Sequence, residues 1–140
     1  MIDERRLAEI LVELPTGKKD LGMMAMAYEN VYVAQVAFGA KDMQTLKTFM
    51  EAEAYDGPSL IICYSPCIAH GVDLKNNHRQ QEMAVKSGHW PLFRFDPKRI
   101  AKGENPLHLD SAEPSIPYRD FVQSETRFNI LWRTHPTEAE

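Results

Sequence analysis

The sequence has few cysteines, no long apolar run and no excess of basic residues, and each shortage excludes a class of protein. Its 140 residues include two cysteines, too few for the disulfide framework of a small secreted domain. No window approaches the ~20 apolar residues that a membrane helix needs. The net charge of −4 differs from the basic balance typical of nucleic-acid-binding proteins. We therefore expect a cytoplasmic protein with reduced thiols that binds neither nucleic acid nor membrane.

The N-terminal stretch MIDERRLAEILVELPTG is amphipathic and acidic, which is typical of neither a signal peptide nor a transit peptide. Its apolar residues recur at helical spacing and predict a short helix over Asp3–Leu14, stopped by Pro15. The length of the whole chain suits one domain with one core.

Apolar runs and amphipathic segments alternate along the middle of the chain. The predicted strands are Val31–Phe38, Leu60–Cys63 and Trp90–Phe95, and the predicted helices are Lys18–Tyr28, Lys41–Tyr55 and Asn76–Ser87. In Lys41–Tyr55, apolar residues recur every three or four positions, the pattern of an amphipathic helix. This alternation predicts an α/β fold, a partial doubly wound parallel sheet with right-handed crossovers. Ligands of such sheets bind beyond the carboxyl ends of strands, where Gly39, Ala40 and Cys67 are expected.

The chain changes character after the third predicted strand. Four prolines within 21 positions predict an extended segment over the surface from residue 97 to residue 140, with a short helix near Tyr118–Glu125. A last apolar cluster could dock back on the core; it comprises Phe128, Ile130, Leu131 and Trp132.

Cys63, Cys67 and His70 follow one another at spacings of four and three, which on a continuous helix would place them on one face. Pro66 and the strand-like run before it argue against that helix and against a self-contained zinc site. Cys63 is interpreted as a small buried hydrophobe. Cys67 could be an inert thiol, a nucleophile or one ligand of a shared metal centre, and the residues alone favour the inert thiol. A nucleophile would need a nearby base, for which the histidines are candidates by composition only.

The remaining polar residues do not form a recognisable active site. His89, Trp90 and His108 are interpreted as packing and surface residues, and Glu51 and Glu53 as part of a solvated helix face. The chain contains no GxGxxG motif, Walker loop or GxSxG elbow. No catalytic residue is therefore assigned.

Several long motifs resemble one family. They are GKKDLGMMAMAYENVYVAQVAFGA (residues 17–40), EAEAYDGPSLIICYSPCIAHG (51–71), SGHWPLFRFDP (87–97) and NPLHLDS (105–111). In this order they resemble the pyruvate:ferredoxin (flavodoxin) oxidoreductases, over about residues 17–133. The resemblance implies the C-terminal part of a thiamine-diphosphate-binding domain, a doubly wound α/β unit. By this match, residues 17–140 form a single α/β domain and residues 1–16 an unmatched N-terminal helix.

The resemblance also implies a role for Cys67. The family decarboxylates pyruvate on thiamine diphosphate with Mg²⁺, passes electrons through [4Fe–4S] clusters to ferredoxin or flavodoxin, and forms acetyl-CoA. A cysteine in the context Tyr-x-x-Cys-Ile is a thiolate ligand of the cluster nearest the thiamine. Tyr64 to Ile68 match that context and place the metal ligand at Cys67. Cys63 receives no ligand role.

The departures from the family pattern bear on activity. The motifs that bind the diphosphate and its magnesium are absent, as are the other three cluster cysteines. We therefore expect the chain alone to bind none of these cofactors and to be inactive. Its expected partner is the remainder of the oxidoreductase, as in a fragment or split subunit, or a second copy of itself. The alternative is a non-catalytic truncated remnant or interaction module with the same α/β fold.

Overall fold

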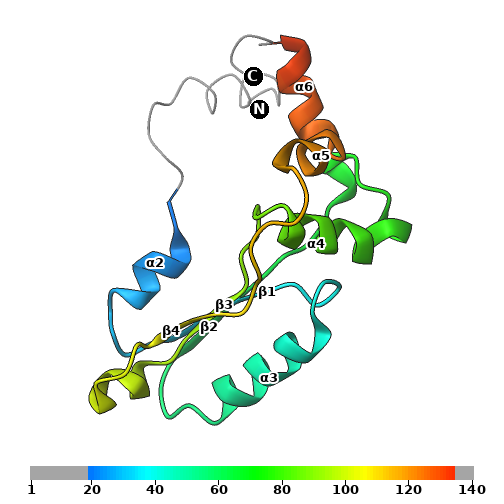
Figure 1. Cartoon of the computed structure of the whole chain (residues 1–140). Helices are drawn as coiled ribbons and strands as arrows, with labels where there is room; N and C mark the ends of the chain where they lie inside the picture. Colours follow the sequence, from blue (N-terminus) through cyan, green and yellow to red (C-terminus); the bar gives the residue numbers. More distant parts are fainter. Residues whose placement is uncertain (1–18, 135–140) are drawn as a thin grey trace, which may run out of the picture.

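The computed structural model describes residues 19–134, and the helix predicted at Asp3–Leu14 lies outside them. A four-stranded sheet forms the centre, in the order β2-β1-β3-β4 (Figure 1). The strands are β1 (Tyr32–Val36), β2 (Ser59–Cys63), β3 (Phe93–Phe95) and β4 (Leu107–Leu109).

The helices are α2 (Leu21–Met26), α3 (Asp42–Glu53), α4 (Asn77–Lys86), α5 (Tyr118–Gln123) and α6 (Thr126–Thr134). Short 3₁₀ turns occupy Ile68–His70, Leu74–Asn76 and Pro97–Lys102. The predicted α/β class is therefore confirmed, and each predicted helix and strand between residues 18 and 125 has a counterpart. Among residues 19–134, no helix combines the length and the apolar character that crossing a bilayer demands.

The strand directions differ in part from the prediction. β1 and β2 pair in parallel, as expected, but β3 runs antiparallel to β1, and β4 antiparallel to β3. The crossover rule applies to a helix that packs back over the face of the sheet. α4 instead lies beyond the carboxyl end of β1, where the Gln81 side chain accepts a hydrogen bond from the Gly39 amide at 2.9 Å. The chain re-enters the sheet from that end, so β3 must run the other way (Figure 1).

The two faces of the sheet are covered by different helices. α2 packs where Gly22 approaches Phe93 and Ile62, which lie on one face because strand side chains alternate. α3 covers the opposite face, to which Tyr32 and Arg94 belong. Strand β4, in the segment predicted to run over the surface, extends the sheet with three residues that are all exposed.

Helix α3 is amphipathic, as predicted, but its orientation is unusual. Gln44, Thr45 and Thr48 are buried, while the large apolar side chains are exposed: Met43, Leu46, Phe49 and Met50. A surface helix normally turns its apolar stripe to the core. The prediction that Glu51 lies on a solvated face holds only in part: its side chain is 36% exposed, but its carboxylate also binds Tyr32 and Arg94 of the sheet.

Arg94 joins α3 to the sheet through a network of charged hydrogen bonds. Its guanidinium donates to both carboxylate oxygens of Glu51, at 2.7 and 2.8 Å, and to both of Asp110, at 2.8 Å each. Tyr32 donates to Glu51 at 2.9 Å, and Gln44 donates to Asp110 at 3.0 Å. Arg94 and Asp110 are almost completely buried. Removing one partner of such a buried pair costs roughly 3–5 kcal/mol, because the other charge is left unpaired.

The network also changes proton affinities. Hydrogen bonds to Asp110 raise the pKa of the Arg94 guanidinium more than burial lowers it. Burial raises the pKa of the Asp110 carboxyl, but hydrogen bonds from Arg94 and Gln44 outweigh it and hold that pKa below its usual range. Burial and the hydrogen bond to Glu51 raise the pKa of the Tyr32 hydroxyl.

The C-terminal helices pack beyond the sheet around an aromatic group. Phe121 is fully buried, and its ring lies 4.5 Å from the His89 ring and 6.3 Å from the Phe128 ring. The packing role predicted for His89 and the docking of Phe128 are therefore confirmed. Ile130 of the same predicted cluster is 53% exposed. The side chains of Leu131 and Trp132 lie outside the described residues.

Gly71 allows the loop after β2 to meet helix α6. It has φ +78°, and a Cβ atom placed there would overlap the Thr126 side chain. Gly103 has a similar φ, +72°, but a Cβ atom at that position would have no other atom within 4 Å. The two glycines share a left-handed backbone but differ in the space around them.

We expect Gly103→Ala to lower the free energy of unfolding by about 1 kcal/mol, the cost of a left-handed alanine. Gly71→Ala should lower it by more, because the added methyl also displaces Thr126. Urea unfolding of the full chain followed by circular dichroism measures both. Equal losses for the two variants would contradict the proposed contact between the loop and α6.

The depressed pKa of Asp110 gives stability that is present above the unfolded-state pKa of about 3.9 and is lost as pH falls through the folded-state value. We expect Asp110→Asn to reduce the free energy of unfolding at pH 7, and the difference from the wild type to shrink below about pH 4. The exposed Asp56 provides a control, since Asp56→Asn should change stability by less than about 0.5 kcal/mol. A difference for Asp110→Asn that is independent of pH would contradict this account.

Candidate functional site

The loop that follows β2 carries the predicted metal ligand. Cys67 is half-buried, its thiol is free, and its backbone is extended, with φ −129° and ψ 138°. It follows Pro66 and directly precedes the 3₁₀ turn Ile68–His70. The expected position beyond the carboxyl end of a parallel strand is confirmed, since β1 and β2 are the parallel pair.

Cys63 does not lie where the sequence placed it. Its predicted burial is wrong, because the residue is exposed and its thiol is free. Cys63 ends β2, which is an edge strand of the described sheet, and pairs only inward with Val36 of β1. The apolar run before it predicts a covered strand, but the described residues place no strand on the outer side of β2.

Tyr64 anchors the start of the Cys67 loop. Its backbone amide donates to the Val36 carbonyl at 3.0 Å, which continues the pairing of β2 with β1. Its hydroxyl donates to Glu125 Oε1 at 2.8 Å, and the Gln80 side chain donates to the same oxygen at 3.0 Å. Glu125 is only 1% exposed. The buried Glu125 carboxylate therefore connects three parts of the chain: the end of β2, helix α4 and the junction between α5 and α6.

Aromatic rings pack around the same anchor. The Tyr64 ring lies 5.2 Å from the Trp90 ring, and Trp90 Nε1 donates to the Val36 carbonyl at 3.1 Å. The His89 ring packs edge-on to Tyr64 at 6.5 Å, and its Nδ1 lies 3.3 Å from the Tyr118 hydroxyl. Through these contacts, Tyr64 at the start of the loop packs against His89, which in turn contacts the C-terminal helices.

The histidines considered as bases for Cys67 pack with aromatic rings. His78 lies 6.2 Å from the Phe38 ring, and His89 belongs to the group around Phe121. The side chain of His70 lies outside the described residues. These contacts give no support for a nucleophile activated by His78 or His89.

The donor set of the loop fits one ligand position, not a whole metal centre. Among the side chains that the structure describes, which do not include that of His70, no three His, Cys, Asp or Glu residues lie close enough together to hold a metal ion. A [4Fe–4S] cluster is held by four thiolates. Cys67 can supply one of them, and because Cys63 is the only other cysteine in the sequence, at least two thiolates would have to come from another polypeptide segment.

The sequence reasoning missed the residues that organise the molecule. Arg94 lies between two phenylalanines in an apolar strand, and this isolated charge is a signal for a buried ion pair. Asp110 directly follows β4, a strand that the sequence analysis did not predict. Glu125 shows no such signal, because its burial depends on the packing of three distant segments.

Comparison with known proteins gives strong matches to one group of enzymes. The chain is 53% identical over 126 residues to a pyruvate-flavodoxin oxidoreductase of Trichormus variabilis. It is 49% identical over 125 residues to a pyruvate:ferredoxin oxidoreductase of Moorella thermoacetica, and 50% identical over 127 residues to a pyruvate-flavodoxin oxidoreductase of Klebsiella pneumoniae. These alignments cover 89–90% of the chain. No family model matches it.

The same alignments cover only 11% of each of these three relatives. The chain thus spans about a tenth of the length of the proteins that it matches. The resemblance inferred from the sequence motifs is confirmed at about 50% identity: the chain matches one segment of pyruvate-flavodoxin and pyruvate:ferredoxin oxidoreductases.

Proposed function

We propose that this chain forms part of the thiamine-diphosphate-binding domain of a 2-oxoacid oxidoreductase that converts pyruvate to acetyl-CoA, and that it is inactive alone. In the assembled enzyme, Cys67 is one thiolate ligand of a [4Fe–4S] cluster. The single observation that carries the proposal is the position of Cys67, half-buried in a loop at the carboxyl end of the parallel pair, within a chain about 50% identical to these enzymes.

The described residues suit Cys67 to contribute to a site shared with other segments. A loop beyond a strand end can reach across to another segment, whereas a cysteine within a strand is held in the sheet. Cys67 follows Pro66 in extended backbone, four residues after the last residue of β2, so it lies in the loop and not in the sheet. The thiol must be deprotonated to bind metal, and three further thiolates must come from the rest of the enzyme.

This chain's own task is to position that thiolate. Tyr64, three residues before Cys67, is fixed through Glu125 and the aromatic packing around it. When bound, thiamine diphosphate and the clusters would supply the decarboxylation and the transfer of electrons to ferredoxin or flavodoxin. No residue of this chain is assigned to the diphosphate, to its magnesium or to the pyruvate pocket.

The proposal is tested by purifying the full tagged chain anaerobically from its own host and examining it by native mass spectrometry. We expect it to co-purify with a larger polypeptide that carries thiamine diphosphate and iron. Cys67→Ser should lower the iron content of that complex by up to about four atoms, one cluster. Cys63→Ser is the matched control and should leave the iron content unchanged. A metal-free monomer or homodimer would instead indicate a folded remnant without chemistry.

The positioning role of Tyr64 is tested by the reactivity of the Cys67 thiol. In a Cys63→Ser background, Tyr64→Phe should speed the reaction of Cys67 with Ellman's reagent about tenfold, because Glu125 loses a hydrogen bond worth roughly 1–3 kcal/mol. Tyr55→Phe is the control, since Tyr55 makes an exposed hydrogen bond to the Asn30 carbonyl. An unchanged rate in Tyr64→Phe would show that this bond does not order the loop.

A further inference from the structure

Helix α3 presents four large apolar side chains to its surroundings and hides its polar ones. Met43, Leu46, Phe49 and Met50 are 68%, 55%, 52% and 62% exposed. Single exposed hydrophobes are common on protein surfaces, but a continuous apolar stripe usually marks an interaction site. The stripe includes every large apolar side chain of α3, so the helix keeps none for the core of its own chain.

The network beneath α3 fixes this orientation. Turning the helix to bury the stripe would break the bonds of Glu51 to Arg94 and Tyr32 and the bond of Gln44 to Asp110. Arg94 would then keep only Asp110 as a carboxylate partner, and Asp110 would lose the hydrogen bond from Gln44. The hydrogen bonds of Glu51 and Gln44 thus couple the orientation of α3 to the network in the sheet. The outward stripe is therefore a stable feature of the fold.

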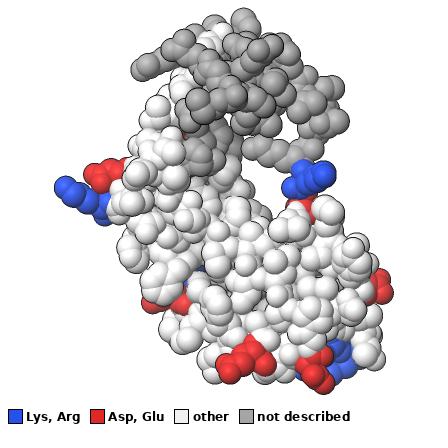
Figure 2. Space-filling view, turned by 180° about the vertical axis from the view of Figure 1, so that it is seen from behind, with Lys and Arg blue, Asp and Glu red and all other residues white. Residues whose placement is uncertain are grey.

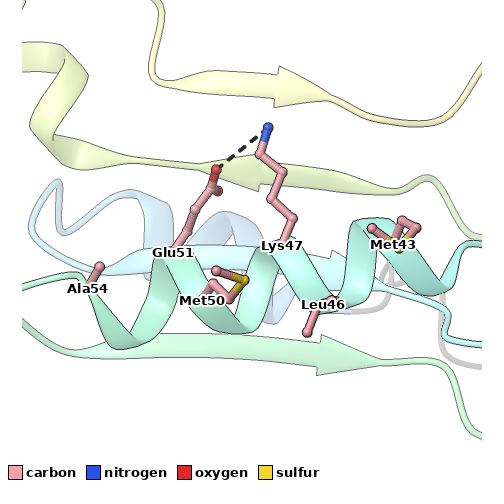
Figure 3. Close-up of a pocket in the computed structure, with 6 residues that line it drawn as sticks. All are labelled: Met43, Leu46, Lys47, Met50, Glu51 and Ala54. Atoms are coloured by element: carbon pink, nitrogen blue, oxygen red, sulfur yellow. Dashed lines mark ion pairs between the residues drawn. The ribbon is translucent and has the colours of Figure 1, made fainter.

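The exposed surface of α3 contains a shallow groove of about 300 Å³. It is lined by Met43, Leu46, Lys47, Met50, Glu51 and Ala54 (Figure 3). Its two charged residues turn toward each other and pair at 3.9 Å between Lys47 Nζ and Glu51 Oε1, so the groove carries no net charge. From Met43 to Ala54 the groove runs along the helix for about 16 Å, the length of three helical turns.

One further face of the molecule is also poor in charge. Figure 2 shows a broad face on which charged side chains are few and lie mainly near the margin. On α2, Leu21, Met23 and Met24 are each more than half exposed. A chain that spans 11% of its relatives has most of the family's polypeptide outside it, and that polypeptide is the natural cover for such surfaces.

We propose that the α3 groove binds an apolar helix of the remaining oxidoreductase polypeptide. This inference rests on the proposed function, since it needs the assembled enzyme. The length of the groove fits three turns of helix, and its neutral rim calls for an occupant with an uncharged, apolar stripe. Because the groove has no net charge, the affinity of this association should be nearly the same at low and at high salt.

A pair of substitutions tests the groove in the full chain. Leu46→Lys places a charge in the groove, and Leu74→Lys places the same charge on a 3₁₀ turn outside it; the two leucines are 55% and 52% exposed. Both variants should unfold at the wild-type temperature, because both side chains are exposed. Leu46→Lys should reduce co-purification with the thiamine- and iron-bearing polypeptide at least tenfold, while Leu74→Lys leaves it unchanged. Equal co-purification of the two variants would overturn the inference and leave the proposed function standing.

The identity of the occupant is tested by photo-crosslinking in the host. With Met50 replaced by p-benzoylphenylalanine, mass spectrometry of the adduct should identify a segment of the oxidoreductase polypeptide, and the same replacement at Leu74 should not. Adducts to a second copy of the chain, adducts to residues 1–18 of the same chain, or no adduct would each overturn the inference. If the wild-type chain does not co-purify with that polypeptide at all, the proposed function fails, and this inference fails with it.

Discussion

The arrangement of this chain depends on the clamp that Glu51 and Asp110 place around Arg94. One guanidinium satisfies two carboxylates, each through two oxygens, and thereby joins helix α3, strand β3 and the residue that follows β4. A buried charge pair of this kind adds little net stability over an apolar core but penalises every arrangement that separates its members. The clamp therefore selects one orientation of α3 rather than supplying much free energy.

This fixed orientation of α3 explains why a stripe of large apolar side chains is exposed. With α3 held by polar groups, its methionine- and leucine-rich stripe contributes nothing to the core, which consists mainly of β1, Leu92, Phe95 and the buried residues of α4 and α5. A small core gives a marginal domain, because the fraction of surface buried on folding falls with chain length. If the α3 groove binds a helix of a larger polypeptide, as proposed, the same stripe would become interior surface, and the polar clamp would lie between two packed elements.

How much the sequence predicts depends on whether a feature is local. Apolar patterns predict helices α2, α3 and α4 and strands β1, β2 and β3, but not β4, because spacing and turn residues act within a few positions. The direction of β3 and the position of α4 beyond the strand ends depend on distant contacts such as Gln81 with Gly39. The orientation of α3 could not be predicted from its own residues, since its stripe is typical of a core-facing helix. The metal-ligand role of Cys67 comes from the resemblance of whole motifs and stays a prediction, whereas the bond of Tyr64 to Glu125 was not predicted.

The clamp lies on the face of the sheet that α3 covers, whereas the Cys67 loop lies at the carboxyl end of β1 and β2. Arg94 fixes α3 on one face, while Glu125 fixes the loop at the carboxyl end of β1 and β2 through Tyr64 and Gln80. β1 is the element common to both, since it bears Tyr32 near one end and Val36, which bonds Tyr64 and Trp90, at the other. A partner that docks on α3 thus meets an element tied to the same strand that supports the thiol. In the proposed assembly, the groove on α3 and the thiolate of Cys67 would therefore both be positioned by β1.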